Sequence, residues 1–86
     1  MDELIKRLTD ELEDELEGII DYSKTYDMLK NVGDRYDADR IEDIASQEYY
    51  HAKTLWEIIS NMGVDLSHNT KIQNDWARVK ELFAIE

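Results

Sequence analysis

The 86-residue chain contains no cysteine and no proline, and it has only three glycines. Without cysteine the chain cannot form a disulfide framework, a thiol nucleophile or a cysteine-ligated zinc or iron–sulfur site. The lack of cysteine also fits a reducing compartment. Because proline is absent and glycine is scarce, few positions force a helix to end. The composition therefore favours α-helix.

Long apolar runs are also missing from the sequence. No segment approaches the roughly 18 apolar residues that cross a bilayer, and the N-terminal MDELIKRL lacks the apolar segment of a signal peptide. We therefore expect a cytoplasmic protein with no membrane partner. Basic residues are few, because 10 Lys and Arg against 21 Asp and Glu give a net charge of −11. Nucleic acid repels so acidic a chain, so we expect no nucleic-acid partner.

The turn-forming residues divide the chain into three helical segments. Gly33 lies in NVGD and Gly63 in NMGVDLSHNT, and both stretches carry the Asn, Gly, Asp and Ser that end helices. The predicted fold is all-α, with one domain over residues 1–86 that consists of an antiparallel helical hairpin and a short third helix. The predicted helices span about residues 2–31, 34–62 and 70–84.

Apolar and tyrosine residues follow a heptad-like spacing along the first two predicted helices, which predicts a buried stripe on each. The first stripe is Ile5, Leu8, Leu12, Glu15, Ile19, Tyr22, Tyr26 and Leu29, widened by Leu16 and Ile20. The second stripe is Ile41, Ile44, Glu48, His51, Leu55, Ile58 and Met62, flanked by Ala45, Ala52 and Ile59. Tyr36, Tyr49 and Tyr50 fall outside the stripes and need no special role. Three polar residues, Glu15, Glu48 and His51, therefore face the predicted core.

The hairpin brings these three side chains to one level. Counting back from the turn at Gly33 at 1.5 Å per residue puts Glu15 within about one helical turn of Glu48 and His51. Two carboxylates in one buried layer repel each other, and a buried charge is costly unless it is paired or bound to a metal. Carboxylate and imidazole ligands together suit iron, manganese or zinc.

One hairpin supplies only half of a dinuclear site. Two hairpins related by a two-fold axis supply four carboxylates and two imidazoles, the ligand set of the di-metal sites in four-helix bundles. The alternative is a polar layer that only fixes register and oligomeric state. In that case Glu15 reaches solvent at the edge of its stripe, and Glu48 or a tyrosine satisfies His51.

Two stretches also resemble the ferritin-like di-iron carboxylate superfamily, as found in bacterioferritin and rubrerythrin. DELEGIIDYSKTY resembles the first half of its motif through Glu15 and Tyr22, and QEYYHAK resembles the second through Glu48, His51 and Ala52. The resemblance covers about residues 5–62. It implies iron ligation by Glu15, Glu48 and His51, with Tyr22 beside the ligands, and an activity that oxidises or handles Fe²⁺ or reduces peroxide.

The chain departs from that family in three ways. It has one motif copy where family members usually have two, which implies a homodimer or larger homo-oligomer with two irons per dimer in a ferritin-like four-helix bundle. It lacks the cysteine-ligated electron-relay part of rubrerythrin, so any electron donor is a separate molecule. Gln47 stands beside Glu48 where a second acid is common. The alternative function is a non-enzymatic acidic helical module that binds a protein, with a structural metal or none.

The third predicted helix carries a stripe of its own, at Ile72, Trp76, Val79 and Phe83. We expect this stripe to pack across the hairpin or on a partner chain. His68 lies in the loop before this helix, where we expect capping or solvent exposure rather than metal ligation.

Overall fold

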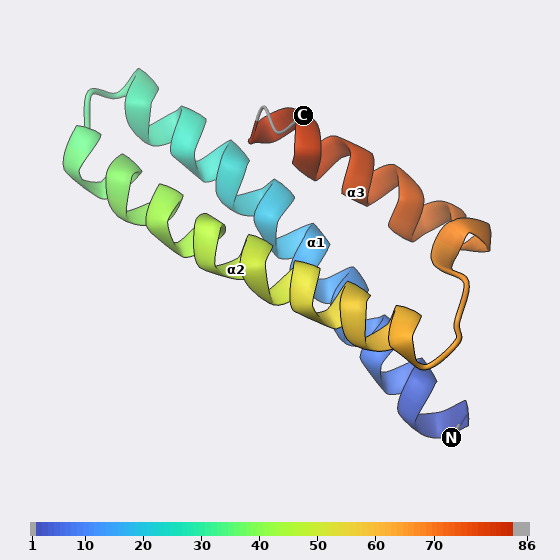
Figure 1. Cartoon of the computed structure of the whole chain (residues 1–86). Helices are drawn as coiled ribbons and strands as arrows, with labels where there is room; N and C mark the ends of the chain where they lie inside the picture. The colour runs from blue at the N-terminus through green and yellow to red at the C-terminus, as the bar shows by residue number, and fades with distance from the viewer. Residues whose placement is uncertain (1, 84–86) are drawn as a thin grey trace.

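A computed structural model describes residues 2–83, and every regular element in that range is helical (Figure 1). The elements are α1 (Asp2–Asn31), α2 (Arg35–Asn61), the short 3₁₀ helix η1 (Leu66–His68) and α3 (Thr70–Leu82). The predicted all-α fold is confirmed, and the first two helices match their predicted bounds within one residue at each end. The third helix ends at Leu82 instead of residue 84, and Ala84 lies outside the described residues.

Glycine and short polar side chains fix the helix ends. Gly33 and Gly63 have φ of 81° and 85°, the left-handed conformation that glycine adopts most easily after a helix. Asp34 caps α2 by accepting a hydrogen bond of 3.0 Å from the Asp37 backbone N–H. Asn69 caps α3 in the same way with the backbone N–H of Ile72. These caps define a tight α1–α2 hairpin and the start of α3.

The third helix lies along one side of the hairpin, chiefly against α1 (Figure 1). Aromatic side chains bridge the wider space between α2 and α3. The rings of Tyr49 and Trp76 stack at 5.7 Å between centroids, and those of Trp56 and Trp76 lie 5.2 Å apart. The molecule is elongated, with extents of 47 × 19 × 18 Å. Within residues 2–83, no helix has both the length and the apolar character needed to cross a membrane.

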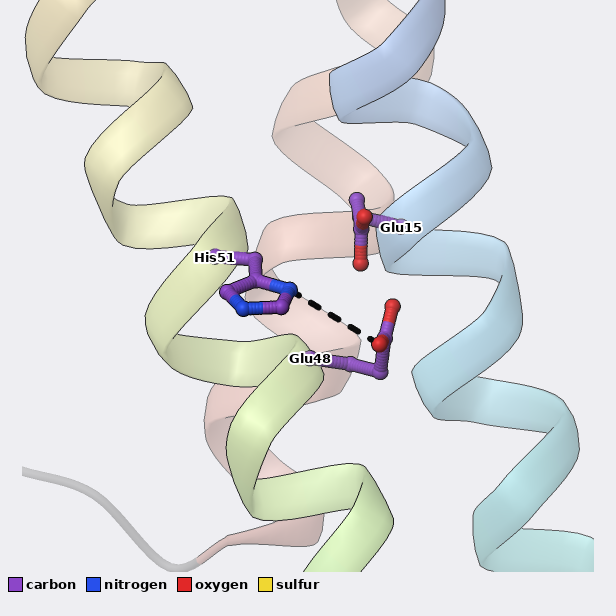
Figure 2. Close-up of side chains that lie close together, drawn as sticks. All are labelled: Glu15, Glu48 and His51. Carbon is purple, nitrogen blue, oxygen red and sulfur yellow. Dashed lines mark ion pairs between the residues drawn. The ribbon is translucent and has the colours of Figure 1, made fainter.

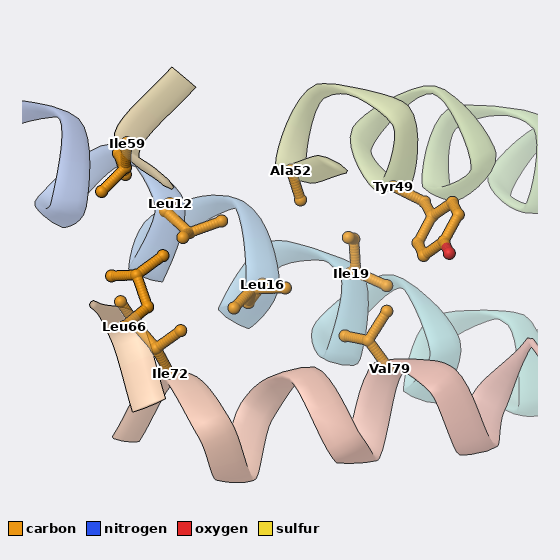
Figure 3. Packing of buried hydrophobic residues seen from close by; sticks show 9 residues of the cluster. All are labelled: Leu12, Leu16, Ile19, Tyr49, Ala52, Ile59, Leu66, Ile72 and Val79. Atoms are coloured by element: carbon orange, nitrogen blue, oxygen red, sulfur yellow. The ribbon is translucent and has the colours of Figure 1, made fainter. Parts of the chain in front are cut away.

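The hydrophobic core lies where the three helices meet (Figure 3). Its buried members are Leu12, Leu16, Ile19, Tyr49, Ala52, Ile59, Leu66, Ile72 and Val79. The residues Leu12, Leu16 and Ile19 of α1 are fully buried and face Ile72 and Val79 of α3. Helix α3 thus packs across its own hairpin, one of the two arrangements that its apolar stripe predicted.

The predicted buried stripe of α2 is only partly correct. Ile44 and Ile58 belong to that stripe but are 39% and 42% exposed, whereas Ala52 and Ile59 at its edge are fully buried. The prediction for Tyr49 is wrong, because its ring is buried against Trp76. The reason is that α3 covers one side of the hairpin, so the α2 residues that face α3 are buried and those on the opposite side are not. We call the uncovered side, which carries Ile44, His51 and Ile58, the open face.

Candidate metal-binding site

Glu15 of α1 and Glu48 and His51 of α2 meet in the space between the two helices (Figure 2). One potential ligand atom from each residue lies within 4.8 Å of the other two. The prediction that the three side chains share one level of the hairpin is confirmed. Figure 2 shows the α3 ribbon behind the hairpin at this level, so the cluster lies toward the open face.

The local sequence of α2 explains why the carboxylates approach each other. Glu48 and His51 are three residues apart and share a helix face. Ala45 and Ala52, which flank Glu48 by about one turn on each side, are 6% and 0% exposed. Small side chains at a helix contact allow a short interhelical distance. The two buried alanines therefore let α2 lie close to Glu15.

Burial differs among the three side chains. Glu15 is part-buried, and its Oε2 atom is fully shielded with no hydrogen-bond partner. The Glu48 side chain is 28% exposed, and that of His51 is 64% exposed. The His51 Nδ1 atom lies 3.8 Å from Glu48 Oε1, which is too long for a hydrogen bond. The expectation that His51 is buried is thus not met in a single chain, because nothing covers the open face.

The electrostatic environment of Glu15 disfavours its charged form. Burial and the adjacent carboxylate of Glu48, which can share a proton with Glu15 and repels its charge, raise the pKa of Glu15 to about 7. The carboxylates of Glu11 and Asp14 raise it further. Among residues 2–83, no lysine or arginine forms an ion pair with Glu15 or Glu48. The cluster therefore has an excess of negative charge that a proton or a bound cation can neutralise.

The donor set fits a divalent ion of the iron, manganese or zinc group. Oxygen and nitrogen ligands lie about 2.0–2.2 Å from such an ion, so two ligands of one ion are at most about 4.4 Å apart. The 4.8 Å limit of this cluster exceeds that separation by only a few tenths of an ångström. The three side chains must therefore move closer together to bind one ion. The Glu15 Oε2 atom, which has no hydrogen-bond partner, is available as a metal ligand.

The other residues singled out in the sequence have less direct relations to the cluster. Tyr22 is part-buried on α1, and its hydroxyl makes no hydrogen bond with Glu15, Glu48 or His51 in the described part of the chain. Its role beside the ligands stays a prediction. His68 is exposed and lies 3.5 Å from Asp65, away from the cluster, as expected. Sequence reasoning missed the influence of Glu11 and Asp14, although the acidic run DELEDELE around Glu15 contains the signal.

Comparison with known proteins finds no matching family, no matching curated protein and no matching solved structure. The resemblance of the two motifs to ferritin-like proteins therefore stays a prediction based on their residues.

Proposed function

We propose that two copies of the chain pair through the open face and form a carboxylate-bridged site that binds two iron ions. The observation that supports this most directly is the convergence of Glu15, Glu48 and His51, with one shielded oxygen of Glu15 left without a partner. A shielded carboxylate oxygen without a partner is costly, and a bound metal ion removes that cost. A polar layer that only fixes register needs no second carboxylate.

The need for a second chain follows from the ligand count. One chain offers two carboxylates and one imidazole, which leaves a bound ion with few ligands. A two-fold axis beside the cluster doubles this to four carboxylates and two imidazoles, enough for two bridged ions. The same pairing covers Ile44 and Ile58, the exposed isoleucines on either side of His51. The metal site and the uncovered apolar residues thus require the same partner surface.

The chemistry that fits this site is oxidation of Fe²⁺. Hard anionic carboxylates stabilise ferric over ferrous iron, so Glu15 and Glu48 would hold Fe²⁺ among ligands that favour its oxidation by dioxygen or peroxide. His51 would supply an imidazole nitrogen to the ligand set. The acidic exterior, with a charge of −11 per chain, attracts Fe²⁺ to the protein. The proposal includes a cytoplasmic location and, for repeated turnover, a separate electron donor.

The test combines metal content with mass and oxidation rate. The purified chain, loaded with Fe²⁺ without oxygen, should bind two irons per dimer, as measured by elemental analysis and sedimentation. His51→Ala and Glu48→Ala should reduce bound iron to near zero. His68→Ala is the matched control, because it removes the other histidine at an exposed position outside the cluster. It should leave the iron content unchanged.

Stopped-flow mixing of the Fe²⁺-loaded protein with oxygen or peroxide then measures the rate of iron oxidation. Oxidation should saturate near two irons per dimer, and Glu15→Ala should abolish it. If Fe²⁺ is oxidised no faster than in protein-free buffer, the protein does not catalyse iron oxidation. A metal-loaded monomer would reject the shared site.

The second candidate function is an acidic helical module that binds a protein. It is favoured by an apolar group at the hairpin tip, where Met28, Val32 and Tyr36 are 68%, 78% and 73% exposed. Isolated exposed apolar residues are ordinary, but a group of them often marks a binding surface. If the wild-type protein binds no iron and chelators do not change its stability, this second function becomes the better one.

A further inference from the structure

Gly18 lies in the middle of α1, where its own chain gives no reason for a glycine. Glycine is among the least favourable residues in a helix interior. Gly18 has no left-handed backbone conformation, since Gly33 and Gly63 are the glycines with positive φ among residues 2–83. A Cβ atom added at Gly18 meets no described atom within 4 Å outside its two chain neighbours and the nearby backbone of its own helix. Alanine would therefore fit this position in the single chain without strain.

The position of Gly18 on α1 relates it to the metal cluster. It lies one helical turn after Glu15 and one turn before Tyr22, so the three residues lie near one line along the helix. Leu12 and Leu16, which contact the α3 side, point more than a quarter turn away from it. Gly18 thus belongs to the open face, at the level of Glu15. On α2, the open face carries the larger side chains of Ile44, His51 and Ile58.

We infer that Gly18 is the point at which a helix of a second copy of this chain lies closest to α1. This rests on the proposed function, because the half-site requires that second copy. Glycine permits the backbone of α1 to approach a neighbour more closely than any other residue does. In a two-fold symmetric pair the contact occurs twice, once from each chain. The short distance brings the two ligand sets together.

A side chain at position 18 separates the two copies. Metal ligands must be held within about half an ångström of their productive positions. Even a methyl group at each of two symmetric contacts moves the ligand sets apart by more than that. The effect of a substitution at Gly18 should therefore have opposite signs in the single chain and in the pair.

The experiment compares Gly18→Ala and Gly18→Leu with wild type and with Lys24→Leu. Lys24 is exposed on α1 and lies about half a turn around the helix from Glu15, so its variant places a leucine outside the contact. In metal-free protein, Gly18→Ala should raise the thermal midpoint, because alanine favours the helix. In Fe²⁺-loaded protein without oxygen, it should weaken the dimer at least tenfold by sedimentation. Gly18→Leu should weaken it further, and Lys24→Leu should leave it unchanged.

The outcomes separate this inference from the proposed function. An iron-loaded dimer that keeps or increases its affinity in Gly18→Ala overturns the role of Gly18. The shared site still stands in that case if His51→Ala removes the iron. A wild-type chain that forms no iron-loaded dimer overturns both. Melting of the metal-free variants checks that a lost dimer does not reflect an unfolded chain.

Discussion

Replacing Glu15 with Gln tests whether the cluster stores unfavourable charge. Glutamine has the shape of a protonated glutamic acid and can donate a hydrogen bond to Glu48, but it carries no charge. Burial and the Glu48 carboxylate raise the pKa of Glu15 from 4.5 to about 7. The folded chain therefore holds a proton at Glu15 over a pH range in which the unfolded chain has released it.

The sign and size of the effect follow from proton linkage. Between about pH 4.5 and pH 7 the folded state binds more protons than the unfolded state, so the free energy of unfolding falls as the pH rises. At about 1.36 kcal/mol per pKa unit, the full shift corresponds to at most about 3 kcal/mol. Glu15 is only part-buried, so solvent screens part of this cost and we expect about 1–2 kcal/mol.

Urea unfolding of metal-free protein, followed by circular dichroism with a chelator present, measures this effect. At about pH 8.5, Glu15→Gln should be more stable than wild type by about 1–2 kcal/mol, and the difference should shrink toward about pH 5.5. Glu42→Gln is the control, because Glu42 is exposed on α2 and has no ion pair among the described residues. It should follow the wild-type pH dependence. Equal slopes for Glu15→Gln and wild type would refute the account of a shielded, strained carboxylate.

Two further predictions concern the fold. Ile72→Ala should lower the free energy of unfolding by about 2–5 kcal/mol, because Ile72 is fully buried. Ile44→Ala, at a 39% exposed site, should lower the stability of the single chain much less. Thermal melts of the metal-free variants measure both losses, and equal losses would contradict the assigned core. Asp34→Ala should lower the free energy of unfolding by about 1 kcal/mol, because it removes the N-terminal cap of α2. Asp34→Asn keeps a side-chain oxygen that can accept the same hydrogen bond and should retain most of the stability. Equal stability of the two variants would show that the cap contributes nothing.

The helices were predictable because their determinants are local. Gly33 and Gly63 adopt the helix-ending conformation that their sequence context suggested. The convergence of Glu15 with Glu48 was also predictable, since a short turn fixes the level of residues in a hairpin. The exposure of Ile44 and Ile58 was not predictable, because it depends on which side of the hairpin α3 covers. A heptad pattern identifies an apolar stripe, but it does not say whether the same chain or another one buries it.

The packing of α3 has a consequence for any larger assembly. Helix α3 buries Leu12, Leu16 and Ile19 on one side of the hairpin, so these residues are not free to contact a second copy. The open face is the remaining side, and it contains the Glu15–Glu48–His51 cluster. Two copies that meet there bring four carboxylates together, and each copy carries a net charge of −11. Their apolar residues favour the contact, but their charges oppose it. In the proposed pair, cations bound between the copies would neutralise the charges where they are closest, and pairing of the chains would then be coupled to metal binding.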